Sequence, residues 1–237
     1  TNDSLHIGYN DLYYAIEKIS NGKHVKDFNI SEITPIMTMG SMNNMQHSTP
    51  IGNIEKIDGV PVYHSWISFL MSTNTGSNNT WNLSFNYQIR DSVGTIGNKP
   101  LYVKALSSGL SNLKSFKYNG NTYFLSLVNP NNFVTGVNTI KAYISKKSSV
   151  ITTPYALASE QFIVAITPTM PDMGNHTSPN NEALTLNTDN TYTGKINLTM
   201  TGVWNIHLVV KTPDGTVIAG GDNDDSGYSN LYWTVNI

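Results

Sequence analysis

The chain has 237 residues, of which 39% are hydrophobic and only 13% are charged, and its formal net charge at pH 7 is −2. This balance, without any block of Lys and Arg, argues against binding to DNA, RNA or an anionic membrane surface, all of which attract clustered cations. The absence of cysteine excludes disulfides, thiolate nucleophiles and cysteine-based metal sites, and no apolar run approaches the ~20 residues of a membrane-spanning helix.

The first predicted element is a strand that opens at Gly8 and continues through residues 9–19. A turn with the sequence Ile-Thr-Pro-Ile-Met follows at residues 33–37. Two further strands are expected within residues 63–71 and 81–85, where apolar residues alternate with polar ones. Alternation with a period of two is typical of a strand that is buried on one face.

A hairpin is predicted over residues 116–128, because Asn119, Gly120 and Asn121 interrupt two apolar runs with turn-forming residues. Gly136 then opens another strand, and the Ile-Thr-Pro turn returns within residues 166–170. Strands follow over residues 192–200 and 204–210, where apolar and polar residues again alternate. This pattern favours antiparallel sheets with one polar face.

Five segments of the first half recur in the second half in the same order. Residues 8–16, 33–37, 47–50, 63–71 and 81–85 align with residues 136–144, 166–170, 176–179, 192–200 and 204–208. The offset between the copies drifts only between 123 and 133 residues, as short loop insertions would cause. Five matches in register indicate a tandem duplication.

The predicted fold class is all-β, with two tandem immunoglobulin-like β-sandwich domains. We assign residues 1–112 to the first domain and residues 113–237 to the second, with the hairpin at 116–128 opening the second domain. The first copy has no counterpart of this hairpin. We therefore expect the first domain to be truncated at its N-terminus, or its opening strands to be contributed by something else.

Methionine and histidine concentrate directly after each Ile-Thr-Pro turn. The candidate metal ligands are Met37, Met39, Met42, Met45 and His47 in the first copy, and Met170, Met173 and His176 in the second. Neither segment alternates like a strand, and both are rich in Gly, Asn or Pro. Both are therefore predicted to be loops.

Thioether sulfur is a soft, neutral ligand that suits Cu(I), and imidazole suits both Cu(I) and Cu(II). The two segments therefore point to copper as the bound ion. Zinc is disfavoured, because thioether is a poor zinc ligand and each segment has one histidine. In the alternative interpretation, the methionines fold over the open end of the sandwich core and the histidines cap turns.

Other conspicuous residues have structural explanations. Met71, Met200, Trp81 and Trp204 are in phase with inward-facing strand positions, whereas His64 and His207 are in the polar, outward phase. The acidic segment 222–227 hints at a calcium loop, but it lacks the Glu that an EF-hand places at its twelfth position, so a solvated turn is favoured. The chain has no nucleophile elbow, zinc-protease motif or phosphate-binding loop, so no enzyme is predicted.

The second copy resembles the YtkA-like domain family, which is also associated with FixH-type proteins. The resemblance rests on Met170-Pro171-Asp172-Met173-Gly174-Asn175-His176, on Tyr192-Thr193-Gly194 and on Met200-Thr201-Gly202-Val203-Trp204. Asn175 is inserted between the Gly and the His of the family pattern. The resemblance implies an immunoglobulin-like sandwich akin to the CopC-type periplasmic copper carriers.

The resemblance also implies an exported protein of the periplasm or outer envelope, lipid-anchored through a segment outside this sequence. The leading functional hypothesis is a copper-binding or copper-delivery protein that passes Cu(I) from its Met/His loops to an envelope copper-acceptor protein. The alternative is a structural or adhesive surface module of tandem immunoglobulin-like domains that binds no metal.

Overall fold

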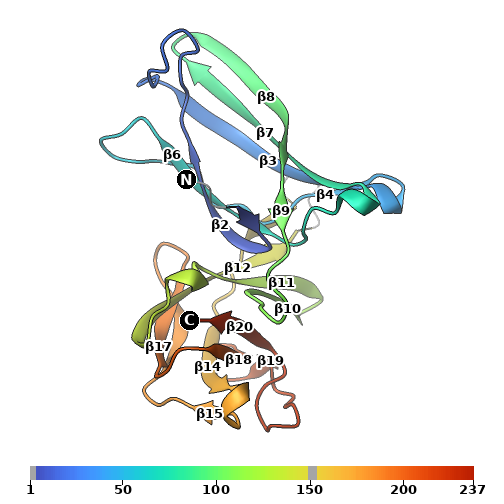
Figure 1. Cartoon of the computed structure of the whole chain (residues 1–237), viewed down its shortest axis with the longest axis vertical. Helices are drawn as coiled ribbons and strands as arrows, with labels where there is room; N and C mark the ends of the chain where they lie inside the picture. The colour runs from blue at the N-terminus through green and yellow to red at the C-terminus, as the bar shows by residue number, and fades with distance from the viewer. Residues whose placement is uncertain (1–3, 149–153) are drawn as a thin grey trace. The chain divides into compact units, whose positions relative to one another are not determined.

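The computed structural model describes residues 4–148 and 154–237, and it divides into two compact units (Figure 1). Unit 1 ends at Ala105 and unit 2 begins at Leu106. The sequence placed this division between residues 112 and 113. It lies earlier in the structure because Ser111 already forms a β-bridge with Thr234, near the end of unit 2.

Unit 2 is a β-sandwich of antiparallel strands. The first layer has the order β11 (Asn121–Leu127), β12 (Gly136–Lys147), β17 (Tyr192–Leu198) and β16 (Glu182–Leu186). The second layer consists of β14 (Ile163–Met170), β18 (Val203–Lys211) and β20 (Tyr232–Asn236). This order is that of an immunoglobulin constant-type domain. The predicted all-β, immunoglobulin-like fold is therefore confirmed for this unit.

Shorter strands complete unit 2. The strand β10 (Leu113–Tyr118) pairs with β11 as the predicted hairpin, and β16 also pairs briefly with β14, which joins the two layers. Three short strands extend the edges: β13 (Tyr155–Leu157) on β12, β15 (His176–Thr177) on β14, and β19 (Val217–Ala219) on β18.

Unit 1 has the same arrangement with fewer strands. One sheet has the order β2 (Gly8–Tyr14), β6 (Tyr63–Phe69) and β5 (Glu55–Lys56). The other has the order β4 (Met45–His47), β3 (Asn29–Met39), β7 (Asn79–Ile89) and β8 (Ser92–Leu101). A short parallel pair joins β1 (Leu5–His6) to β9 (Val103–Lys104).

The two units share details of register as well as strand order. Gly8 lies opposite Phe69 in unit 1, as Gly136 lies opposite Leu198 in unit 2. The side chains of Asn10 and Asn138 each donate a hydrogen bond, at 2.8 Å, to the carbonyl oxygen of the glycine two residues earlier. The duplicated sequence segments therefore occupy matching places in two sandwiches.

A tryptophan lies at the centre of each core. Trp81 and Trp204 are fully buried, and their indole N–H groups donate to the carbonyl oxygens of Met71 and Met200 at 2.9 and 3.0 Å. Because a buried indole N–H needs an acceptor, each contact fixes the loop that precedes the tryptophan strand. The side chain of Met200 packs against the core, whereas that of Met71 is 38% exposed, contrary to the inward position expected for it.

The outward position predicted for His207 is wrong. Its ring is buried, and it lies 5.2 and 5.3 Å from the rings of Tyr228 and Tyr232. Nδ1 donates to the carbonyl oxygen of Ser229 at 2.6 Å, and Nε2 lies 3.0 Å from the Thr169 hydroxyl. The strand β18 alternates as predicted, but the loop before β20 covers its outer face, and no local pattern shows this.

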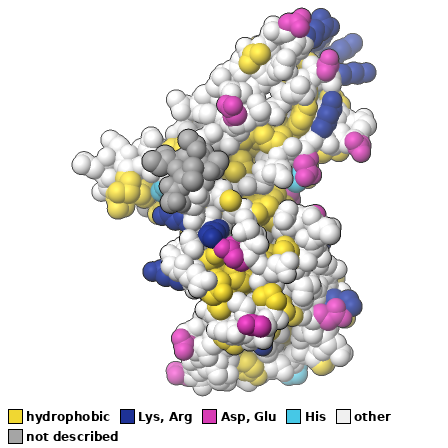
Figure 2. Space-filling view, turned by 180° about the vertical axis from the view of Figure 1, so that it is seen from behind, with side chains coloured by type: hydrophobic (Ala, Val, Ile, Leu, Met, Phe, Trp, Pro, Cys, Tyr) yellow, Lys and Arg dark blue, Asp and Glu magenta, His cyan; other side chains and the backbone are white. Residues whose placement is uncertain are grey.

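The surface is mainly uncharged and polar. Figure 2 shows scattered acidic and basic side chains among predominantly uncharged ones, as the 13% content of charged residues implies. In the described ranges, no helix is long and apolar enough to cross a membrane.

Gly220 occupies the tightest backbone position in unit 2. Its φ angle is +72°, and a Cβ atom there would lie 2.0 Å from the carbonyl oxygen of Leu208. That oxygen also accepts a hydrogen bond of 2.7 Å from the Ser229 hydroxyl. Glycine is needed here both for the left-handed conformation and for the close approach to β18.

We predict that Gly220→Ala destabilises the protein by about 2–4 kcal/mol, because left-handed strain adds to overpacking against backbone. Gly215→Ala is the matched control, since Gly215 has a φ of +90° but a Cβ atom there would meet nothing beyond its chain neighbours within 4 Å, and it should lose only about 1–2 kcal/mol. Urea denaturation measures both values, and equal losses would contradict the close-approach argument.

Candidate functional site

The candidate ligands lie at the tips of two equivalent hairpins, β3–β4 in unit 1 and β14–β15 in unit 2. Each tip begins with a short 3-10 turn, η1 (Gly40–Met42) or η4 (Pro171–Met173). Two residues with positive φ follow each turn: Asn43 and Asn44 in unit 1, and Gly174 and Asn175 in unit 2. Asn and Gly tolerate this left-handed conformation best, which explains the Asn- and Gly-rich sequences there.

The prediction that both segments are loops is wrong for six of the eight candidate ligands, which lie in strands, although residues 40–44 and 171–175 do form turns. Met37 pairs with His47, Met39 with Met45, and Met170 with His176, each across a two-stranded ladder. Only Met42 and Met173 lie in the turns themselves. The strands that return from the 3-10 turns, β4 and β15, are short. Too few of their residues alternate for a strand pattern to be recognised from sequence.

The sulfur atoms divide into two groups. Met37, Met39 and Met170 belong to the hydrophobic cores, and Met37 lies opposite the buried Trp81 in the ladder between β3 and β7. Met42, Met45 and Met173 are exposed, by 52%, 53% and 56%. Residues two apart on a strand share a face, so Met37 and Met39 both point into the sandwich. An ion arriving from solvent therefore meets only the exposed sulfurs.

The two candidate histidines have different surroundings. The ring of His47 packs edge-on against Trp81, with 5.5 Å between ring centroids, and its Nδ1 donates to the carbonyl oxygen of Ser48 at 2.9 Å. Its Nε2 is buried and has no hydrogen-bond partner within the described ranges. His176 is exposed. His176, but not His47, can therefore turn a ring nitrogen towards a solvent ion without rearrangement.

Beyond the Met37–His47 pair the hairpin of unit 1 has two further residue pairs, whereas the hairpin of unit 2 has none beyond Met170–His176. This difference changes the equivalence of the ligands. Met39 and Met170 both directly precede the 3-10 turn, so Met42 corresponds to Met173 and Met45 to His176. Sequence alignment instead pairs His47 with His176, because residues 47–50 and 176–179 match. The equivalent, exposed donors are Met42 and Met45 at one tip, and Met173 and His176 at the other.

Metal ligands harder than thioether sulfur, such as carboxylates, do not form a cluster in the part of the chain that the structure describes. There, no group of three or more His, Cys, Asp and Glu side chains could hold a metal ion. In the acidic turn at 222–227, the Asp224 carboxylate accepts hydrogen bonds from the backbone N–H groups of Ser226 and Tyr228, at 2.9 and 3.2 Å. Its hydrogen bond from the Ser226 hydroxyl lowers the Asp224 pKa, as in a turn stabilised by its own side chain.

Sequence reasoning also missed a polar pair on the first sheet of unit 1. His64 Nε2 lies 2.7 Å from the Asp11 carboxylate, and the His64 ring packs 5.0 Å from Tyr13. The two residues lie on neighbouring strands, where Asp11 is directly opposite Trp66 and His64 opposite Tyr13. Only the register of β2 against β6 reveals this pair, since 53 residues separate the two side chains in sequence.

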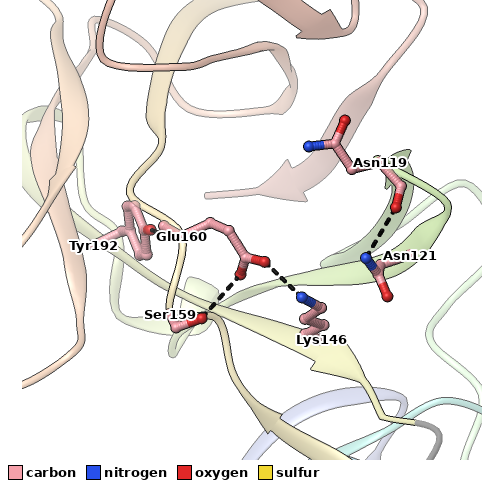
Figure 3. A network of polar contacts seen from close by, with 6 residues as sticks. All are labelled: Asn119, Asn121, Lys146, Ser159, Glu160 and Tyr192. Atoms are coloured by element: carbon pink, nitrogen blue, oxygen red, sulfur yellow. Dashed lines mark hydrogen bonds and ion pairs between the residues drawn. The ribbon is translucent and has the colours of Figure 1, made fainter.

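A second polar network lies at the edge of unit 2 (Figure 3). Lys146 Nζ contacts the Glu160 carboxylate at 2.5 Å, and the Tyr192 hydroxyl donates to the Glu160 carbonyl oxygen at 3.2 Å. Burial raises the pKa of Glu160, but the hydrogen bond from Lys146, together with other polar neighbours, outweighs it and leaves the pKa below its ordinary value. Burial raises the pKa of Tyr192 to about 12. These groups join β12 to the segment before β14.

We predict that Glu160→Gln reduces the acid sensitivity of folding. A carboxylate with a lowered folded-state pKa stabilises the protein above its unfolded-state pKa of about 4.5, and this contribution is lost as pH falls through the folded-state pKa. Urea midpoints at pH 7 and pH 3 should therefore differ less in Glu160→Gln than in wild type, by a modest amount because the pair is partly exposed.

Glu182→Gln is the control for this measurement, because both side chains of the Lys195–Glu182 pair are more than half exposed. It should change the pH dependence less than Glu160→Gln does. An equal change in the two variants would show that the Lys146–Glu160 contact has no special role.

Comparison with known proteins finds a family model that is similar to part of unit 2. The sequence profile of the YtkA-like family matches residues 118–209, a range that includes the β14–β15 hairpin with Met170, Met173 and His176. No functionally curated protein matches the chain.

Among solved structures, the chain aligns with the Escherichia coli adhesin FdeC at 10% sequence identity and a TM-score of 0.27. The alignment covers 99% of this chain and 61% of the adhesin chain. At this TM-score, the likeness supports no inference about function. The match to the YtkA-like family model thus lies within the immunoglobulin-like sandwich of unit 2.

Proposed function

We propose that this chain is a non-catalytic structural module of an exported protein, in which two sandwiches present surfaces to other polypeptides. The observation that carries the proposal is the use of potential ligands as packing. Met37 and Met170 are both buried beside the central tryptophan strands, and His47 packs against the Trp81 ring. Side chains used in this way stabilise the fold and are not available for ligand exchange.

Two features support export. The chain has no cysteine and little charge, and its surface is dominated by uncharged polar side chains, as expected for an envelope protein. The YtkA-like resemblance of unit 2 implies the same location. The periplasm or the outer envelope fits these features.

If the buried methionines serve packing alone, Met37→Leu and Met170→Leu should each cost less than about 1.5 kcal/mol, because the side-chain volume is kept. The corresponding Ala variants should cost about 2–5 kcal/mol, because they leave cavities. The melting temperature of wild type should not change when EDTA and a Cu(I) chelator are added. A chelator-induced fall of several degrees would contradict a metal-independent structural role.

A second candidate function, soft-metal binding, is favoured by the equivalence of the two tips. Exposed soft donors occur at the same two positions of both hairpins, as Met42 with Met45 and as Met173 with His176. Thioether and imidazole ligands suit Cu(I), and an exposed tip allows transfer to an envelope copper-acceptor protein. In this function the buried methionines Met37, Met39 and Met170 are supports of the hairpins and not ligands.

This candidate predicts that Cu(I) binding, measured by titration against a competing chelator, weakens at least tenfold when both donors of one tip are replaced. The variants are Met42→Leu with Met45→Leu, and Met173→Leu with His176→Gln. Met71→Leu is the control, because Met71 is an exposed methionine outside the tips. If the control and the tip variants bind Cu(I) equally, the tips are not metal sites.

A further inference from the structure

The outer face of the first sheet of unit 1 carries acidic and aromatic side chains. On β6, Ile67 and Phe69 are fully buried in the core, so the residues that alternate with them point to the other face. Residues directly opposite each other on neighbouring strands share that face. The register therefore places seven side chains on it: Tyr9, Asp11 and Tyr13 of β2, His64, Trp66 and Ser68 of β6, and Glu55 of β5.

Hydrogen bonds and ring contacts hold several of these side chains in place. The Asp11 carboxylate accepts a hydrogen bond from the Tyr9 hydroxyl at 2.5 Å, and it lies 2.7 Å from His64 Nε2. The ring of His64 packs against that of Tyr13, with 5.0 Å between the two centroids. A fixed carboxylate therefore lies close to a fixed tyrosine ring.

The charge of this face is negative. Asp11 and Glu55 are its two acids, and none of its seven residues is Lys or Arg. Protonation of His64 would offset only one of the two negative charges. Glu55 is exposed, and the side chains of Asp11 and His64 are 25% and 26% exposed. A cationic group that arrives from solvent can therefore approach the carboxylates.

Tyr13 offers such a cation a second contact. Its side chain is 64% exposed, and its ring packs on the histidine that contacts Asp11. An ammonium or guanidinium group over a tyrosine ring is attracted by the negative face of the ring. Trp66 is buried, and its ring lies 5.9 Å from that of Tyr9. The indole thus supports the face from below, and Tyr13 is the ring that a ligand can cover.

The equivalent face of unit 2 has a different chemistry. In the matched registers, the positions of Asp11, Tyr13, His64 and Trp66 are occupied by Thr139, Lys141, Thr193 and Lys195. The sandwich therefore forms without an acid or aromatic rings at these positions, and folding does not explain their presence in unit 1.

The exposure of this face does not depend on whether another strand lies beside β2. In unit 2, Lys141 occupies the position of Tyr13 and is exposed. It is exposed although the N–H of Val128, directly after β11, donates to its carbonyl oxygen. A flanking strand lies in the plane of the sheet, so it leaves the outward side chains accessible.

We propose that this outer face of β2, β6 and β5 binds a basic segment of another polypeptide through an arginine side chain. The guanidinium would lie over the Tyr13 ring beside the Asp11 carboxylate, and Glu55 would add attraction from the other side of β6. Arginine suits this face better than lysine, because its planar group both stacks on rings and donates to carboxylates in pairs. This inference rests on the proposed function as a module that presents surfaces to other polypeptides, and it names the chemistry of the partner.

The test uses the full chain and two synthetic peptides, Gly-Ser-Arg-Ser-Arg-Ser-Gly and the same sequence with citrulline in place of both Arg residues. Citrulline keeps the planar shape of the side chain but has no charge. We expect the arginine peptide to shift the NMR signals of Tyr13 and His64, and its affinity to fall about fivefold or more between low and high salt, because the charges are exposed and screened. The citrulline peptide should shift neither signal.

Tyr13→Ala should weaken binding of the arginine peptide about two- to fivefold, as expected for an exposed cation–π contact, and Asp11→Asn should weaken it at least as much. Glu182→Gln is the control, because it removes an exposed acid from unit 2 and should leave the affinity unchanged.

Equal binding of the two peptides would overturn the inference, as would unchanged affinity in Tyr13→Ala and Asp11→Asn. A neutral oligosaccharide that shifts the Tyr13 and His64 signals more strongly than the arginine peptide would also overturn it. These outcomes leave the chelator-independent melting of the proposed function unchanged, so the two proposals fail separately.

Discussion

The burial of one tryptophan between two antiparallel layers is the constraint on which each unit depends. Trp81 and Trp204 are fully buried, and each indole N–H is satisfied by a methionine carbonyl on the preceding loop. A tryptophan buries a large apolar area, and its single polar atom cannot be left without an acceptor. The tryptophan thus sets both the spacing of the layers and the path of the loop that enters the strand.

This constraint explains the fate of the methionines. The strand beside each tryptophan must fill the interior with flexible apolar side chains, and Met37 and Met170 do so. Methionine adapts to irregular space in a core. The sulfurs that remain in solvent are at the hairpin tips, beyond the sandwich. Within a few residues of chain, the methionines whose side chains lie over the core therefore serve packing, and those beyond the end of the core are accessible to a ligand.

The two units differ at one edge of the sheet that contains β2 in unit 1 and β12 in unit 2. Unit 2 has a strand on each side of β12, and its core residues are fully buried. Unit 1 keeps the same framework without that strand among the described residues, and Leu12, Ile16 and Phe85 stay partly exposed. The two units therefore share one framework and differ in how completely their core residues are covered.

Period-two alternation and the repeated segments were sufficient to predict an all-β chain, its immunoglobulin-like sandwiches, the hairpin at 116–128 and the buried tryptophans, because each is a local or repeated pattern. Sequence also located all of the candidate ligands. It did not show that Met42, Met45, Met173 and His176 are exposed, whereas Met37, Met39, Met170 and His47 pack against the cores. Cross-strand register decided that separation, as it decided the burial of His207 and the contact between Asp11 and His64. Register joins residues distant in the chain, and its outcome depends on which strands and loops cover each face, so only the tertiary structure contains it.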